Sequence, residues 1–349
     1  MSRHRGRRLL LLVALLGAGA AASLYLWVRA APAPGSSRRV VVELPIGTPT
    51  RQIFRALAAK GVVRHGLLAE GYYRVFRRAA PLRAGEYALS PGDSLDRTID
   101  LLVRGEVLRH TVVVPEGATS AECFALFVRE GIGTDQGFRR ASREVEPPSS
   151  GGAGAEGDLE GFLFPDTYVV TRSTPTREVL ALMVDDFRRH LPPELERSAA
   201  RLGLSVRQAV TVASLVEKET SLASERPHVA AVYLNRLRIG MRLQCDPTVI
   251  YALQKQGKWT GRLHRSELEI DSPYNTYLYG GLPPGPICNP GAAALQAAVA
   301  PAKSDDLYFV ARGDGGHYFS RTYADHLAMI GRSRANSASA SDDEEVPPR

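Results

Sequence analysis

Cysteine, tryptophan and methionine are scarce in this sequence of 349 residues, which contains three, two and four of them. Cys123, Cys245 and Cys288 are odd in number and include no CxxC pair, so a fold held by a framework of disulfides is excluded. One disulfide could form in an oxidising compartment, but the sequence does not choose the pair.

The sequence also lacks the ligand spacing of a metal site. No histidine belongs to a motif such as HExxH, and we expect neither a metal nor another cofactor. His317 could contact a sugar, although a structural role is commoner for such a residue. The other histidines considered are His110, His228, His264 and His326.

A stripe of basic residues is absent as well. The chain carries 44 basic and 37 acidic residues, a net charge of +7, and the basic residues are scattered, as at residues 38–39, 77–78 and 139–140. Nucleic acid is therefore not an expected partner. A modest basic excess outside a membrane instead suits contact with anionic lipid or an anionic polymer.

A long apolar run near the N-terminus is the first feature that is present. Residues 1–8 form a basic stub, residues 9–28 contain no charge, and residues 29–39 read as a flexible tether. Twenty apolar residues can cross a bilayer as one helix, and the basic stub places the N-terminus in the cytoplasm. A cleaved signal peptide is the alternative, but the run is longer than a usual signal core. We expect an uncleaved anchor with the remaining chain outside the cytoplasm.

Three copies of one pattern follow this tether. In each copy an extended apolar run ends in Pro and Gly, and Ser or Thr then opens a helix that closes near another Gly. Apolar residues seven and ten positions beyond the first Gly are predicted to point inward. They are Phe54 and Leu57, Ile99 and Leu102, and Phe124 and Phe127, and the closing residues are Gly61, Gly105 and Gly131. Such units suit a module that lies along a polymer, and ordinary packing explains them equally well.

The middle of the chain is less regular. Residues 131–158 include a run rich in Pro, Gly and Ser at 146–155, which predicts a mobile loop without core residues. The aromatic-rich stretch 159–168 could floor a groove for sugar faces or form a buried turn. Residues 176–191 predict an amphipathic helix.

A carboxylate on the apolar side of a helix is the central candidate. Residues 205–220 predict a helix capped by Ser205, and at about 100° per residue Glu217 and Glu219 point to nearly opposite faces. Glu219 lies on the face with the bulkiest apolar side chains, where loss of hydration raises a carboxyl pKa toward neutral pH. Glu219 is therefore the candidate acid. The alternative is that one Glu pairs with Arg207 or Lys218 while the other is solvated.

The C-terminal part predicts several elements around stiff, polar loops. Residues 235–248 and 271–277 are crowded with hydrogen-bonding side chains, and residues 280–287 form a Pro-Gly loop that suits a rigid cleft. The other predicted elements are a turn at 224–227, helices at 229–237 and 292–300, a buried strand at 307–311, a hairpin at 312–319 and a disordered tail at 333–349.

An ordered set of motifs from Val40 to Ile330 resembles one known family. The segments ASLVEKET at 213–220, SERP at 224–227, YLNRLRIGMRLQCDPTVIYAL at 233–253, SPYNTYLYGGLPPGPICNPG at 272–291 and the late LYFVA and GGHYFS closely resemble the MltG (YceG-like) endolytic murein transglycosylases. The resemblance places the family's catalytic Glu on Glu219, the residue that the helix argument also selects.

The resemblance implies an α+β fold in three parts. A single N-terminal transmembrane helix precedes a small LysM-like α/β subdomain at residues 40–108 and a mixed α/β catalytic domain at 109–332. The implied location is the cell inner membrane, with the catalytic domain periplasmic. The implied partners are peptidoglycan glycan strands, the membrane and peptidoglycan synthases.

The resemblance also implies the reaction. The enzyme would cut within nascent strands between N-acetylmuramic acid and N-acetylglucosamine, leave 1,6-anhydro ends and so act as a terminator of strand elongation. Glu219 would act first as acid and then as base. Gln244, Asp246, Tyr274 and Asn275 are candidate substrate-binding residues, each of which could instead brace a loop. Glu225 is a further candidate, either as a residue that supports the side chains in contact with substrate or as a helix cap.

Several alternatives stay open from the sequence. A hydrolytic muramidase would share nearly every feature, and a non-catalytic peptidoglycan-binding scaffold of the synthesis machinery would need Glu219 only as a structural residue. Ser214 and Lys218, four residues apart, could also mimic a Ser-Lys acyl-transfer pair.

Overall fold

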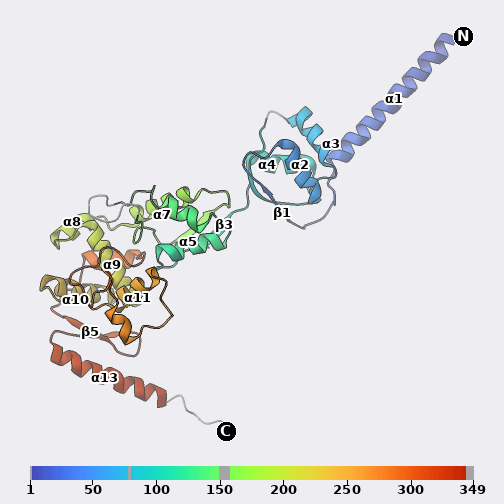
Figure 1. The fold of residues 1–349 in the computed structure, drawn as a ribbon. Coiled ribbons are helices and arrows are strands. Elements are labelled where there is room, and N and C mark those ends of the chain that lie inside the picture. Colours follow the sequence, from blue (N-terminus) through green and yellow to red (C-terminus); the bar gives the residue numbers. More distant parts are fainter. Residues whose placement is uncertain (1, 78–79, 149–157, 343–349) are drawn as a thin grey trace, which may run out of the picture. The chain divides into compact units, whose positions relative to one another are not determined.

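The computed structural model describes residues 2–77, 80–148 and 158–342, and it has an α+β fold (Figure 1). Contacts divide the chain into two compact units. Unit 1 contains residues 1–111 and 169–174, and unit 2 contains residues 112–168 and 175–349. The predicted fold class is confirmed.

Unit 1 begins with helix α1 (Ser2–Arg29), of which Leu10–Arg29 is long and apolar enough to span a membrane. Its end packs on the rest of unit 1, because the ring of Tyr25 lies 5.8 Å from that of Tyr72 and Arg29 Nε donates to Asp96 at 2.7 Å. The following segment is not the free tether that the sequence predicts. The Ala33 amide donates to the Pro91 carbonyl at 2.9 Å, and the Ser90 hydroxyl donates to the Ser36 carbonyl at 3.0 Å.

The first two copies of the repeated pattern build unit 1. Strand β1 (Val40–Leu44) pairs antiparallel with β2 (Gly85–Leu89), with Val40 opposite Leu89 and Leu44 opposite Gly85. Each strand leads into a helix, α2 (Thr50–Ala59) or α4 (Leu95–Arg104), and α3 (Gly66–Tyr72) with the π-turn η1 (Tyr73–Arg77) lies between them in the chain. The four residues predicted to point inward in these two copies are fully buried and belong to one core.

The third copy opens unit 2. Strand β3 (His110–Val113) is followed by α5 (Ser120–Arg129), and Phe124 and Phe127 are buried as predicted. All three closing glycines have positive φ, between 68° and 77°, which an L side chain rarely adopts. The predicted reuse of one strand-turn-helix unit is confirmed.

A short helix precedes the segment predicted to be a mobile loop. Helix α6 (Asp135–Ala141) starts at Thr134, whose hydroxyl accepts from the Gly137 amide at 3.1 Å, and its Phe138 is fully buried against Phe124. One aromatic anchor and one cap are thus enough to order a short helix before the loop predicted at 146–155. Residues 149–157 lie outside the described part of the chain.

The remaining helices of unit 2 surround α9 (Val206–Glu219). Helices α8 (Leu195–Arg201), α10 (Arg226–Arg238), α11 (Asp246–Lys255) and α12 (Ala292–Val299) all contact α9. Residues 209–216 are all buried, so α9 is a core helix rather than a surface helix (Figure 1). Strand β4 (Thr167–Val170) pairs with β3, α7 (Thr176–His190) follows it as predicted, and the 3-10 helix η2 (Arg265–Glu269) follows α11.

A hairpin and a long helix end the described chain. Strand β5 (Tyr308–Ala311) pairs antiparallel with β6 (His317–Ser320), which confirms the predicted hairpin, but β5 is only half-buried rather than buried. Helix α13 (Tyr323–Asp342) packs on both strands. It continues ten residues into the predicted disordered tail, because no Pro or Gly interrupts residues 333–342 and alanine favours a helix. Residues 343–349 lie outside the described part.

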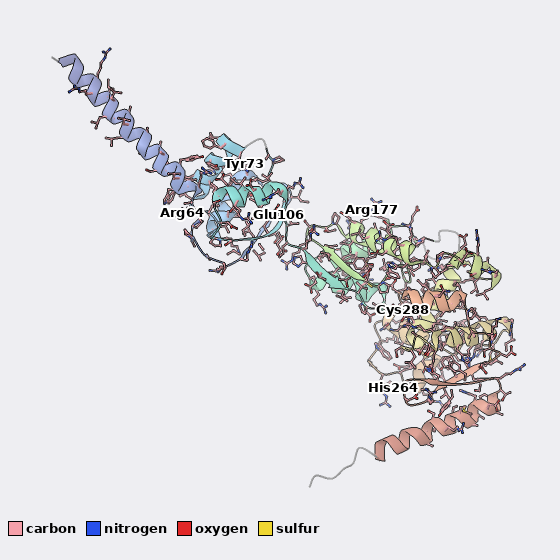
Figure 2. All side chains as sticks on the ribbon, turned by 180° about the vertical axis from the view of Figure 1, so that it is seen from behind. Arg64, Tyr73, Glu106, Arg177, His264 and Cys288 are labelled. Atoms are coloured by element: carbon pink, nitrogen blue, oxygen red, sulfur yellow. The ribbon has the colours of Figure 1, made fainter. Side chains whose placement is uncertain are left out.

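The three cysteines are buried free thiols, so no disulfide forms among them. Cys288, labelled in Figure 2, lies inside unit 2, where its thiol donates to the Ser214 carbonyl at 3.4 Å.

Glu160 connects separate segments of unit 2 and is 5% exposed. One carboxylate oxygen accepts from the Ser120 amide at 2.9 Å, and the other accepts from the Tyr251 hydroxyl at 3.0 Å. Burial raises the pKa of Glu160 to about 7, against these hydrogen bonds, which favour the charged form.

We expect this carboxyl to make the stability of unit 2 depend on pH. An unfolded Glu loses its proton near 4.5, while the folded residue keeps it until about 7, so its protonated form favours folding at low pH and that contribution is lost as the pH rises through this window. The unfolding free energy of the wild type, minus that of Glu160→Gln, should fall by about 3 kcal/mol between pH 4.5 and 7. Thermal unfolding of both proteins across this range measures the difference, and a constant difference would contradict the assignment.

Candidate active site

Glu219 is the last residue of α9, and Ser205 fixes where this helix starts. The Ser205 hydroxyl accepts from the Gln208 amide at 3.2 Å, and Gln208 Oε1 accepts from the Ser205 amide at 2.8 Å, which is a capping box. The chain becomes extended at Thr220. The predicted helix and its cap are confirmed.

The Glu219 side chain is half-buried and receives a hydrogen bond from Tyr233. The Tyr233 hydroxyl donates to Glu219 Oε1 at 2.5 Å, from a ring on α10 that is 1% exposed. Burial raises the pKa of Tyr233 well above its usual value, so its hydroxyl keeps the proton that it donates. Glu219 makes no ion pair with any described residue.

Burial raises the pKa of Glu219, as the sequence predicts. The hydrogen bonds from Tyr233 and from the Cys245 thiol act in the opposite direction because they favour the carboxylate. The nearby negative charge of Asp246 raises the pKa further, and His317 lowers it. The raised pKa favours the protonated form of Glu219, which can give its proton to a basic atom that approaches.

Glu217 occupies a different environment. Its carboxylate accepts from Arg226 Nη2 at 2.8 Å and from the Gly291 amide at 2.9 Å, and its side chain is 5% exposed. Burial raises its pKa too, but both oxygens are engaged by fixed donors. Glu217 is therefore a structural residue that joins α9 to α10 and to the start of α12, and its partner is neither Arg207 nor Lys218.

The alternative Ser-Lys pair does not form. The Ser214 hydroxyl is fully buried, donates to the Thr211 carbonyl at 2.7 Å and accepts from the Ile287 amide at 3.1 Å. Lys218 Nζ instead donates to the Gly117 carbonyl at 3.3 Å. An acyl-transfer role for Ser214 is therefore excluded.

His317 reaches the site from β6 and is held by Glu225. The ring Nδ1 bonds Glu225 Oε2 at 2.7 Å, and the His317 amide donates to Glu225 Oε1 at 3.0 Å. Among the described residues the other ring nitrogen has no hydrogen-bond partner, and Phe309 packs edge-on against the ring at 5.4 Å. Glu225 thus supports and orients His317. Its side chain does not cap α10.

Gln244 is exposed in the segment that precedes α11, and Asp246 is exposed at the first position of α11. The Tyr277 hydroxyl donates to Asp246 Oδ1 at 2.5 Å. Gln244 has a φ of 48°, an uncommon conformation for a residue other than Gly. Its backbone amide donates to the Thr276 carbonyl at 3.2 Å. The amide of Cys245 donates to Thr276 Oγ1 at 2.9 Å, so this segment is tied to the loop at 271–280.

The other two predicted substrate-binding residues lie differently. Asn275 is fully buried, and its amide nitrogen donates to the Leu268 and Ile270 carbonyls at 2.9 and 2.8 Å. The Asn275 side chain therefore braces its own loop, which is the alternative that the sequence leaves open for this residue. Tyr274 is half-buried beside Tyr251, with ring centroids 4.9 Å apart, and it lies away from the immediate partners of Glu219.

Tyr233 and Tyr277 were not singled out from the sequence. Both belong to motifs that were recognised, at 233–253 and 272–291, but a tyrosine on an apolar helix reads as a core residue. Only the packing of α10 and of the 271–280 loop shows that each hydroxyl meets a carboxylate.

Glu219 does not line the partly open cavity at the end of α10. That cavity, of about 870 Å³, lies between Arg201–Leu204, one side of α10 and Pro301–Asp305. The exposed residues Gln244 and Asp246 instead place the surroundings of Glu219 at an open edge of unit 2. An open edge suits a long chain better than a small molecule.

Several known proteins are similar to this chain. The model of the YceG-like family matches residues 42–332. The chain is 32% identical over 307 residues to the endolytic murein transglycosylase of Bacillus subtilis (strain 168), covering 83% of this chain and 84% of that protein. It is 30% identical over 319 residues to the protein of the same name from Streptococcus pneumoniae (serotype 2, strain D39), covering 83% of this chain but only 58% of that protein.

A solved structure is also similar. The crystal structure of a YceG-like protein from Listeria monocytogenes matches with a TM-score of 0.50 and 29% sequence identity, over 84% of this chain and 100% of that chain.

The hydrogen bond from Tyr233 predicts a change in the titration of Glu219. In Tyr233→Phe the carboxylate loses a donor that favours its charged form, so the pKa of Glu219 should rise further. Carbon-13 NMR of labelled Glu carboxyls, assigned with Glu219→Gln, measures this shift. Tyr251→Phe is the matched control, because that hydroxyl bonds Glu160 instead. An unchanged or lower pKa in Tyr233→Phe would contradict the role of the hydrogen bond.

Proposed function

This chain belongs to the YceG-like family, and we propose that it is a membrane-anchored endolytic murein transglycosylase in which Glu219 is the acid and the base. The observation that carries the proposal is a half-buried carboxyl with a raised pKa, no ion-pair partner among the described residues, and a place beside exposed polar side chains. The chain spans 58% of the pneumococcal relative and 84% of the Bacillus relative, both named for this activity.

The reaction needs only one carboxyl to move protons. Protonated Glu219 gives its proton to the oxygen that links muramic acid C1 to the next sugar, and the C1–O bond breaks. The resulting carboxylate then takes the proton of the muramic acid C6 hydroxyl while O6 bonds to C1. The products are a 1,6-anhydro end and a free hydroxyl on the departing sugar, and no water is consumed. Such acid-base assistance is worth about 10²–10⁴-fold in rate.

The neighbours of Glu219 suit these two roles. Loss of hydration keeps the acid protonated for the first step, whereas Tyr233, Cys245 and His317 favour the carboxylate that the first step leaves. Asp246 provides negative charge near the position where C1 becomes positive. Gln244 has a strained backbone φ and an exposed side chain, and its side-chain amide is the candidate contact to the sugar.

The same neighbours keep a hydrolytic reaction as the second candidate. Most glycosidases use two carboxylates, and Asp246 is a second carboxylate within electrostatic range of Glu219. In a muramidase Asp246 would act on water or on C1 directly. A lyase uses Asp246 only for its charge.

The other parts of the chain complete the proposal. Arg3, Arg5, Arg7 and Arg8 favour a cytoplasmic N-terminus, so α1 anchors the protein in the inner membrane, and unit 2 and the part of unit 1 that follows α1 lie in the periplasm. Unit 1 is the LysM-like module, which binds the glycan strand through its two strand-helix pairs. A role beside the peptidoglycan synthases, where cleavage ends strand elongation, fits this placement.

Variants of the two neighbouring glutamates separate the enzyme from a scaffold. Glu219→Gln should lose at least about 10²-fold of strand cleavage while its Tm and strand binding stay near the wild type. Glu217→Gln should lower Tm, because it removes the closer of the two carboxylates that pair with buried Arg226, the other being Glu116, yet retain cleavage below that Tm. Product release from uncrosslinked strands measures both. Cleavage lost only in Glu217→Gln would overturn the assignment, and no cleavage by the wild type would support a scaffold.

The mass of the products separates the lyase from the hydrolase. Wild-type fragments should carry 1,6-anhydro ends, and Asp246→Asn should slow cleavage without changing those ends. Mass spectrometry of fragments from the full chain in detergent distinguishes the two products, since hydrolysis adds one water. Fragments with added water, lost together with activity in Asp246→Asn, would identify a two-carboxylate muramidase instead.

A further inference from the structure

A second cavity of unit 2, of about 600 Å³, lies between the first turns of α9 and the Pro-Gly loop at 281–284. Its walls are Leu and Pro side chains together with a few polar residues, and Arg207 is the only charged residue that lines it. No step of the proposed reaction uses this cavity.

Arg207 is unusual among the half-buried cations of unit 2. It makes no ion pair and no side-chain hydrogen bond with any described residue, and its Nε is fully buried without a partner. Its guanidinium lies over the Phe162 ring at 5.8 Å. A Cβ on Gly285 would come within 2.7 Å of Arg207 Nη2, so this Gly lets the loop backbone approach the guanidinium.

The two segments that form most of the cavity wall carry no carboxylate, and Asp158 and Glu160, whose charges act on neighbouring Tyr274, make no ion pair with Arg207 among the described residues. Residues 205–216 of α9 and residues 280–288 of the loop include no Asp or Glu. A half-buried arginine without a counter-ion loses hydration without compensation, and a carboxylate matches its planar pair of N–H donors. The cavity is therefore built to receive an anion.

The cavity is connected to the active site through shared elements. Arg207 precedes Glu219 by twelve residues on the same straight helix, a separation of about 18 Å along its axis. The Pro-Gly loop directly continues the segment that contains Tyr277, the partner of Asp246. Burial, with the negative charges of Asp158 and Glu160, raises the pKa of Tyr274 to about 12, and the positive charge of Arg207 acts against this rise.

We propose that this cavity is an anion subsite in which Arg207 binds a carboxylate carried by the glycan strand, a few sugars away from the bond at Glu219. The proposal rests on the proposed function for the identity of the polymer. Peptidoglycan strands offer two sources of this group, the carboxylates of the attached peptides and the lactyl carboxylate of muramic acid that peptide removal exposes. Arg207 thus selects where along a strand the enzyme binds.

The test compares charged and neutralised strands on the full chain in detergent. Strands with acetylated peptide amines are used either with free carboxylates or after amidation of those carboxylates. Arg207→Gln should raise KM about tenfold on the charged strands, with kcat changed less than twofold, because a charge-assisted contact away from the reacting bond is lost. Amidation should raise the wild-type KM by a similar factor and leave the KM of Arg207→Gln unchanged.

Matched variants guard against a general effect on folding. Arg197→Gln removes the same charge from an arginine on α8 that is 81% exposed and paired with Glu194, and its KM should equal that of the wild type. Arg207→Lys keeps the charge without the planar pair of donors and should give an intermediate KM. If Arg207→Gln is unstable, the amidated strands still test the wild type, and equal wild-type KM for charged and amidated strands would overturn the subsite.

Further experiments identify the source of the carboxylate and test the subsite separately from the proposed function. Strands stripped of peptides should abolish the effect of Arg207→Gln if the peptide supplies the carboxylate, and keep it if the lactyl group does. Strand binding is also measured in Glu219→Gln and in Glu219→Gln/Arg207→Gln. Binding that depends on Arg207 without cleavage by the wild type would reject the enzyme but keep the subsite. Normal cleavage with no effect of Arg207→Gln would reject the subsite but keep the enzyme.

Discussion

The site depends on one hydrogen bond, from the hydroxyl of Tyr233 to Glu219 at the end of α9. A carboxyl buried among apolar side chains without a donor would remain protonated and could not serve as a base. A carboxyl paired with a cation would be ionised at all working pH values and could not serve as an acid. A neutral donor that cannot lose its own proton leaves both states of Glu219 accessible, as a single acid-base residue requires.

The rest of unit 2 holds these two residues in place. Helix α9 is enclosed by four other helices, and Glu217, one residue before Lys218, ties it to Arg226 on α10 and to the amide of Gly291. The two glutamates therefore divide the work between them. Glu217 fixes the angle of α9 against α10, and this angle sets the position of Tyr233 relative to Glu219. The capping box at Ser205 fixes the other end of the same helix.

The features that could be predicted from the sequence are those set by local interactions. The cap of α9, the inward residues of the three strand-turn-helix units and the apolar face of Glu219 follow from spacing within about fifteen residues. The partners could not be predicted in this way. Arg226 rather than Arg207 pairs with Glu217, and His317 meets Glu225 across 92 residues, because these contacts depend on how the helices and the hairpin pack. Asn275 shows a further limit, since residue type does not distinguish a sugar contact from a brace.

The three thiols of unit 2 have a consequence for how the protein can be observed. Each is enclosed by packed side chains, and burial raises the pKa of each above that of a free cysteine, so the reactive thiolate is suppressed in the native fold. A labelling reagent can reach them only when α5, the segment before α11 or the segment before α12 opens. The labelling rates of Cys123, Cys245 and Cys288 therefore report the opening of three different regions. The rate at Cys245 reports on the region that touches Glu219.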